Sequence, residues 1–134
     1  MMAFACQINA TIFVKTGATG NGSDWDNAFG TLTEALAQAQ AGDQIWVAAG
    51  TYTPTNDTNR NTSFKVKDGV KIYGGFAGTE TSLVQRASKL NKTILSGEIG
   101  KPGIADNTYN VLLIENATVN TVVDGFIITA GNAS

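Results

Sequence analysis

The chain has no histidine, a single cysteine and only two prolines among its 134 residues. Without histidine it lacks the commonest zinc and copper ligand, and also the general base of Ser-His-Asp and Cys-His nucleophile systems. Its one cysteine, Cys6, cannot close an internal disulfide, and a free cysteine usually behaves as a small apolar residue. Any chemistry must therefore use carboxylate, lysine, arginine or tyrosine side chains.

Positive charge is also sparse, because nine Lys and Arg residues against eleven Asp and Glu give a formal net charge of −2. The basic residues are scattered singly, so no basic stripe is available to neutralise phosphates, which argues against nucleic acid as a partner. The apolar residues 1–10 are too few to cross a bilayer, which takes about 20 residues. This segment predicts either the remnant of a secretory signal or a first strand, and both interpretations stay open.

Four segments share one sequence register and predict a repeat. They span residues 45–50, 70–75, 92–97 and 121–126, and they start 25, 22 and 29 residues apart. A recurring spacing of this length is typical of solenoids, and residues two apart in a strand share a face. The alignment predicts an inward β-branched column and a small-residue column beside it, formed by Val47, Ile72, Ile94 and Val123 and by Ala49, Gly74, Ser96 and Gly125.

One helix is predicted, over about residues 31–41. Thr31 and Glu34 have the spacing of a capping box, and Leu32 and Leu36 lie on one apolar face. Gly42 is placed to end the helix in the left-handed conformation. The end repeat of a solenoid must be atypical, so we expect this helix to cover the first coil and shield its interior from water.

The pattern of these segments resembles a known family. Residues 22–28, 41–54 and 72–80, together with the helix between them, resemble the N-terminal module of bacterial right-handed parallel β-helix proteins. That group includes proteins similar to polymorphic outer membrane proteins, within the pectate-lyase-like superfamily. The resemblance implies an all-β, right-handed parallel β-helix in which residues 11–134 form one domain, the cap and first coils of a longer protein.

The same resemblance implies a secreted or surface-displayed bacterial protein with an adhesive or glycan-contacting role and no catalytic residue. Lyases of this fold hold Ca²⁺ and a uronate on carboxylates and use Arg or Lys as the base. Here the candidates are Glu98 and Asp124, with Asp43 and Arg86 further away, and their register does not converge. We expect Asp43 and Asp124 instead to fix turns through backbone hydrogen bonds.

Two functional classes follow from these observations. The first is a non-catalytic structural or adhesive module that contacts a glycan or protein surface. The alternative is the N-terminal part of a polysaccharide lyase or glycoside hydrolase whose active coils lie beyond Ser134. No second cap follows the strand-like residues 125–131, so we expect an open edge that favours self-association.

Two further sites are weaker predictions. Asp24 and Asp26 offer two carboxylates for Ca²⁺, but without the spacing of a calcium loop, so no cofactor is expected and a simple turn is preferred. Four aromatic residues would form a sugar-stacking platform if they surfaced on one wall, although packing explains each of them with fewer assumptions; they are Trp25, Trp46, Tyr52 and Tyr73.

Overall fold

The computed structural model describes residues 10–55, 59–99, 107–114 and 120–132. Cys6 and most of the segment 1–10 lie outside these residues. Within them, nine short strands are accompanied by one α-helix and one 3-10 turn. The elements are β1 (Thr11–Val14), α1 (Leu32–Gln38), β2 (Gln44–Ala48), β3 (Gly50–Tyr52), β4 (Phe64–Val66), β5 (Lys71–Phe76), η1 (Leu83–Gln85), β6 (Thr93–Ser96), β7 (Leu112–Ile114), β8 (Val122–Asp124) and β9 (Phe126–Thr129).

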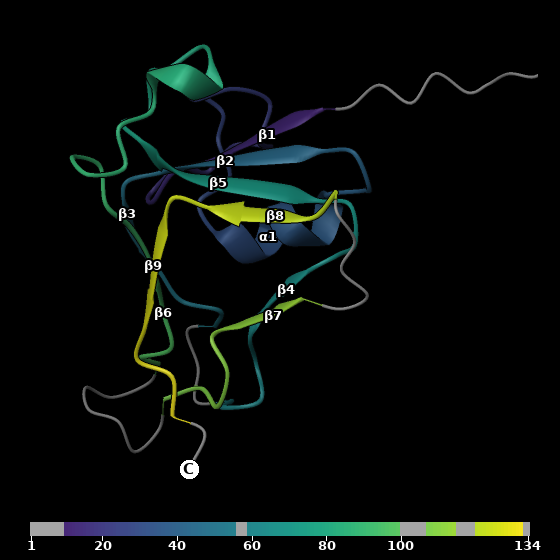
Figure 1. Cartoon of the computed structure of the whole chain (residues 1–134), viewed down its shortest axis with the longest axis vertical. Coiled ribbons are helices and arrows are strands. Elements are labelled where there is room, and N and C mark those ends of the chain that lie inside the picture. The colour runs from purple at the N-terminus through teal and green to yellow at the C-terminus, as the bar shows by residue number, and fades with distance from the viewer. Residues whose placement is uncertain (1–9, 56–58, 100–106, 115–119, 133–134) are drawn as a thin grey trace, which may run out of the picture.

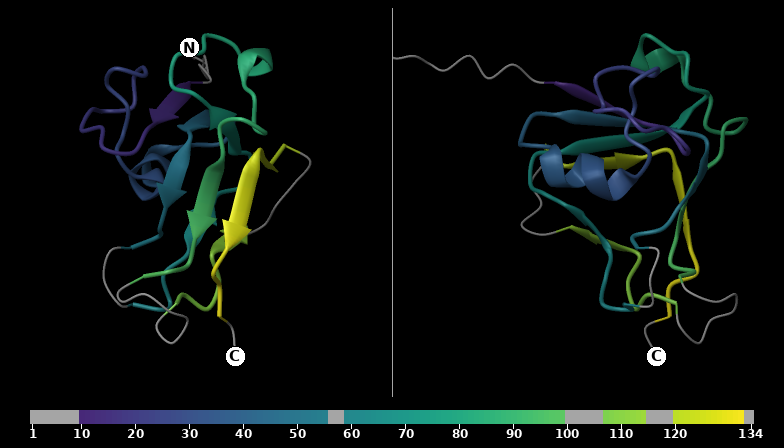
Figure 2. Two further views of the ribbon diagram at one scale, coloured as in Figure 1. Left: turned by 90° about the vertical axis from the view of Figure 1, so that its left-hand side faces the viewer. Right: turned by 180° about the vertical axis from the view of Figure 1, so that it is seen from behind.

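The strands form three parallel sheets, and the chain visits them repeatedly in the same order. Sheet A has the order β1-β2-β5-β8, sheet B the order β3-β6-β9, and sheet C pairs β4 with β7. The first pass is β2, β3 and β4, the second is β5, β6 and β7, and the third is β8 and β9. The three sheets lie along the sides of a triangle (Figure 1), and Figure 2 (left) shows the strands of sheet B side by side. Mostly parallel sheets of this kind are compatible with a segment of a β-solenoid.

The core lies inside the triangle, where one row of sheet A stacks strand on strand. Ile45 pairs with Ile12 on one side and Ile72 on the other, and Ile72 pairs in turn with Val123. Ile45 and Ile72 are fully buried, and Val123 is partly buried against the same cluster. Neighbouring side chains along a strand point to opposite faces, so the next row of sheet A lies on the outer face.

The predicted β-branched column is therefore correct for Ile72 and Val123, which pair, and wrong for Val47 and Ile94. Val47 pairs with Val14, and it is Ile45 that stands beside Ile72. Ile94 belongs to sheet B, where it pairs with Thr51 and is only half-buried, while its neighbour Leu95 faces the core. The register shifts between Trp46 and Ala48, because β5 carries one residue more than β2 at this point. Such a bulge moves every later side chain by one position.

The predicted small-residue column is formed in part. A Cβ atom on Gly74 would lie 2.6 Å from the carbonyl oxygen of Gly125, so these two glycines let the second and third passes meet at one corner. Ser96, however, pairs with Thr129 in sheet B. The backbone N–H of Ala49 donates to the carbonyl of Phe76, beyond the bulge. The predicted column is therefore correct for Gly74 and Gly125, where the second and third passes turn from sheet A to sheet B. It is wrong for Ala49 and Ser96.

Helix α1 begins where the sequence predicts but ends earlier. Thr31 is the N-cap, and its side-chain oxygen accepts a hydrogen bond from the N–H of Glu34 at 3.2 Å. The helix ends at Gln38, not near residue 41, because Ala39 is already extended and Lys67 donates to the carbonyls of Ala37 and Ala39. Gly42 has a φ of +96°, but it lies in the turn that leads into β2.

The apolar face of α1 packs onto the first pass. Leu32, Ala35 and Leu36 are buried in the same cluster as Val14 and Phe64, and α1 contacts β1, β2 and β4. Seen from behind, α1 lies in front of the sheets, on the side away from the third pass (Figure 2, right). One end of the core is therefore covered by the helix.

Candidate functional site

The end of the core opposite α1 has unpaired strand edges and partly exposed apolar side chains. Within the described residues, β7, β8 and β9 each pair on one side only. Leu95 is 0% exposed, whereas its partner Ile128 on the same inner face is 48% exposed. Ile114 likewise pairs with the buried Val66 but is itself exposed. We call these three edges and their inward side chains the open end; it has the features of a surface that binds further strands.

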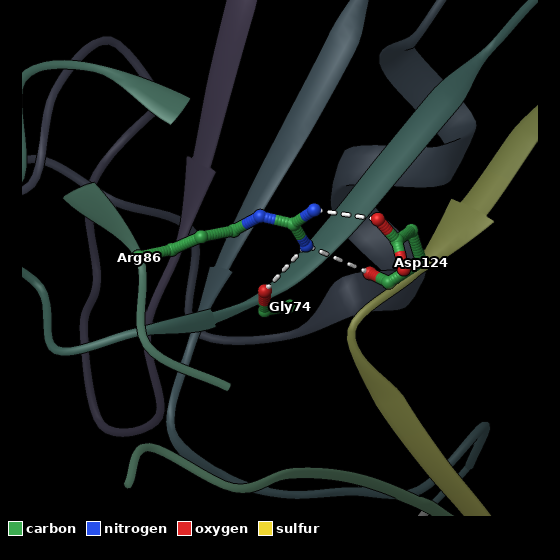
Figure 3. Close-up of polar contacts among 3 residues, drawn as sticks. All are labelled: Gly74, Arg86 and Asp124. Atoms are coloured by element: carbon green, nitrogen blue, oxygen red, sulfur yellow. Dashed lines mark hydrogen bonds and ion pairs between the residues drawn. The ribbon is translucent and has the colours of Figure 1, made fainter. Parts of the chain in front are cut away.

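An arginine joins the second pass to the third at the corner between sheets A and B. Arg86 donates through one guanidinium nitrogen to Asp124 Oδ2 at 2.5 Å, and through the other to the carbonyls of Gly74 and Asp124 (Figure 3). Its guanidinium also lies over the ring of Tyr73, 5.1 Å from the centroid. The Arg86 side chain is 19% exposed and that of Asp124 is 57% exposed. A guanidinium held by these groups ties two passes together.

A second arginine makes a similar tie across another corner. Arg60, between β3 and β4, donates to the carbonyl of Asn107 at 2.7 Å and to that of Asn132 at 3.2 Å. Its guanidinium stacks over Tyr109, 4.2 Å from the ring centroid. The first pass therefore contacts the loop before β7 and the segment after β9. Nothing in the sequence pattern marked Arg60, because its partners lie 47 and 72 positions away.

Two of the acidic candidates, Asp43 and Asp124, accept hydrogen bonds from other parts of the chain. Asp43 accepts hydrogen bonds from the N–H groups of Ala10 and Gln40, both at 3.0 Å, so it fixes a turn as expected. The same expectation for Asp124 is wrong, because its carboxylate pairs with Arg86. Among the described residues, no group of three or more cysteine, aspartate or glutamate side chains converges to hold a metal ion.

Comparison with known proteins places this architecture in a family. The family described as "Protein of unknown function (DUF1565)" matches residues 15–133. The chain belongs to this family. DUF1565 is associated with β-helix proteins, in agreement with the three parallel sheets. No curated protein and no solved structure matches the DUF1565 chain.

Asp24 and Asp26 lie in a hydrogen-bonded turn of this DUF1565 chain, which is the interpretation that the sequence favours over a calcium site. Asp24 Oδ1 accepts from the backbone N–H of Asn27 at 2.8 Å and from its side-chain amide at 3.0 Å. Asp26 is exposed to solvent. Asp24 therefore uses its carboxylate to hold the backbone of the loop between β1 and α1.

The four predicted platform aromatics do not share one exposed wall. Trp46 and Tyr52 are buried, and Tyr52 donates its hydroxyl to the carbonyl of Ala48 at 2.9 Å. Burial raises the pKa of Tyr52 to about 12, against a smaller lowering from a hydrogen bond with the Thr16 backbone. On the outer face of sheet A, Trp25 and Trp46 instead pack with Phe13 and Phe76 at centroid distances of 4.8 to 5.5 Å. This cluster fastens the loop between β1 and α1 to the sheet.

Glu80 anchors the excursion between β5 and β6. Its carboxylate accepts from the N–H groups of Ala77, Gly78 and Thr79 at 2.7 to 3.0 Å, and its carbonyl accepts from the Trp25 indole. Burial acts to raise the pKa of Glu80, but the backbone hydrogen bonds outweigh it, so the pKa lies below its usual 4.5.

The lowered pKa of Glu80 predicts a pH dependence of stability. Because the folded pKa is below the unfolded one, the contribution is fully present above the unfolded value and is lost as pH falls through the folded value. We expect acidification from pH 7 to pH 3 to lower the melting temperature more in the wild type than in Glu80→Gln. Circular dichroism melts at several pH values measure this. Equal acid sensitivity of the two proteins would contradict it.

A groove of about 530 Å³ runs between α1 and β4 of the DUF1565 chain. Leu36, Ala37, Phe64 and Val66 contribute to its mostly apolar lining, and Lys65 and Lys67 lie along it. The volume is within the range of small-molecule sites.

Among the described residues, no helix combines the length and apolar character needed to span a bilayer.

Proposed function

We propose that this chain is the capped start of a right-handed parallel β-helix in a secreted or surface-displayed bacterial protein. In this proposal it is a structural and adhesive module without catalytic activity. The three parallel sheets are the walls of the helix, and α1 closes its first coil. The open end receives the next coil or the strands of a partner.

The difference between the two ends of the core supports this proposal. At one end, Leu32 and Leu36 of α1 are buried and shield the first pass from water. At the other, Ile114 and Ile128 share the inner face with the buried Val66 and Leu95, yet both are exposed. A module with one closed and one open end fits the start of a stack of repeats, where an end unit must be atypical.

A non-catalytic role is supported by how the charged candidates are used. The Arg86 guanidinium is committed to Asp124 and to backbone carbonyls, and so is a poor base. Asp43 is committed to backbone N–H groups. The proposed module needs no cofactor, and its partner would be a glycan or protein surface contacted by the walls and their loops.

The open end is tested by its capacity to recruit strands. We expect the average mass from light scattering to rise above that of one chain as the concentration of the wild type increases. A lysine at an edge strand opposes pairing, so Ile128→Lys should stay at one chain over the same range. Val84→Lys, which changes an exposed apolar side chain on η1, is the matched control and should behave like the wild type.

A wild-type mass of one chain at all concentrations would count against an adhesive open end. Polymer degradation would overturn the non-catalytic part separately. We expect no rise in ultraviolet absorbance from unsaturated products when the chain is incubated with a uronate polymer. A rise that survives purification would instead favour the lyase class.

A further inference from the structure

The third pass is the least buried part of the described core. In the range 120–132 no residue is buried, and the apolar side chains of β8 and β9 are half-buried or exposed. By contrast, four of the five residues of β2 are buried, as are four of the six of β5. Local unfolding has a low free energy where few apolar contacts are buried. The third pass therefore has much less packing to lose on opening than the two passes beneath it.

Backbone ladders connect the third pass to the second. Val122 donates its N–H to the carbonyl of Val70, and Gly97 donates to that of Thr129. Alternation along a parallel ladder then directs the N–H groups of Ile127 and Thr129 toward the carbonyls of β6. These two amides report directly on whether β9 is attached.

The two arginines hold the third pass near both of its ends. Arg86 binds Asp124 at the end of β8, and Arg60 binds the carbonyl of Asn132 after β9. Each guanidinium also has partners in the second pass, since Arg86 lies over Tyr73 and Arg60 over Tyr109. Both side chains would therefore keep their place when the third pass leaves.

We propose that the segment from Thr121 to Asn132 opens and closes as a unit on the folded first and second passes, with Arg86 and Arg60 acting as straps that set this equilibrium. Opening uncovers the edges of β5 and β6, to which β8 and β9 are paired in the closed form. Because the straps are preorganised on tyrosine rings, they favour recapture of the segment. This local motion is independent of whether the chain acts as an adhesive module.

Amide hydrogen exchange measured by NMR on the full chain tests the proposal. In the wild type, kept dilute enough to remain one chain, the amides of Ile127 and Thr129 should exchange at least about tenfold faster than those of Tyr73 and Ile94. The latter two lie on the ladders of β5 and β6 that face the first pass, so third-pass opening leaves them protected. Equal protection of all four amides would show that the third pass does not open separately.

Variants test the straps. Arg86→Gln and Arg60→Gln should each accelerate exchange at Ile127 and Thr129 by about tenfold, because charge-assisted hydrogen bonds to the third pass are lost. Tyr73 and Ile94 should keep their wild-type rates. Asp124→Asn removes only the charge partner of Arg86, and provides a milder variant if Arg86→Gln unfolds. Lys89→Gln changes an exposed lysine of the same excursion and should have no effect.

Two results would overturn the strap role. If Arg86→Gln and Asp124→Asn leave the rates at Ile127 and Thr129 unchanged, the ion pair does not control opening. If they accelerate all four amides equally, Arg86 supports the whole fold and not the third pass alone. Neither result depends on oligomer formation, so failure here and failure of the adhesive role are distinguishable.

Discussion

Replacing Leu36 with aspartate is expected to unfold the first pass and cause aggregation. Leu36 is 5% exposed and packs in the main core cluster from its position on α1. Truncation of a buried leucine alone costs about 2–5 kcal/mol, and burying an unpaired charge costs more. Domains of this size are stable by only about 5–15 kcal/mol. Leu36→Asp should therefore remove most of the stability and uncover the end that α1 shields.

The measurement is a thermal melt followed by circular dichroism, together with size-exclusion chromatography of the purified chain. Ala37→Asp is the matched control, because Ala37 is the next residue of α1 and is exposed. The control adds the same charge to the same helix without placing it in the core, so it should remain folded and monomeric at low concentration. An unchanged melting temperature and a clean monomer for Leu36→Asp would contradict the role of α1 as a cap.

The start of α1 was predictable because its signals are local. Thr31 and Glu34 are three residues apart, and their hydrogen bonds need nothing from the rest of the fold. The end of α1 was not predictable in the same way. Lys67, which satisfies the last carbonyls, lies 28 to 30 positions along the chain. The end of the helix therefore coincides with a tertiary contact to Lys67, and Gly42 does not end the helix as expected.

Among the charged candidates, the interaction between residues close in sequence was predictable, and the interaction between distant residues was not. Asp43 was expected to fix a turn, and one of its partners, Gln40, is three residues away. The pairing of Asp124 with Arg86 spans 38 positions and depends on the path of the excursion between β5 and β6. Sequence spacing carries no information about that path. The same limit applies to Arg60 and its partners.

The register error has a related cause. The residue types of the segment 92–97 match those of the segments in sheet A and so predict the same wall, although this segment contains β6 of sheet B. Residues that fill a parallel β core look alike on every wall, so composition identifies strands without assigning them to a sheet. In addition, the extra residue of β5 shifts the register where β2 and β5 pair. A bulge of this kind leaves little trace in a single sequence.

A matched pair of substitutions separates the predicted column from the observed register. If Ile72 and Ile94 faced one interior column, truncating either to alanine would cost a similar amount. In the structure, Ile72 is fully buried between Ile45 and Val123, whereas Ile94 is half-buried on the opposite face from Leu95. We expect Ile72→Ala to lower the free energy of unfolding by about 2–5 kcal/mol, as for other buried isoleucines. Ile94→Ala should cost about 1 kcal/mol or less, mainly from reduced strand preference.

Urea unfolding of the two variants and the wild type measures the difference, provided that the slopes with denaturant agree. Leu95→Ala supplies the second half of the comparison, because Leu95 is the core-facing neighbour of Ile94 on β6 and is fully buried. It should resemble Ile72→Ala and not Ile94→Ala. The two large losses would then come from inward-facing side chains of sheets A and B, and the small loss from the outward-facing Ile94. Equal losses for Ile72→Ala and Ile94→Ala, with a small loss for Leu95→Ala, would instead support a single column and contradict the inward orientation of Leu95 on β6.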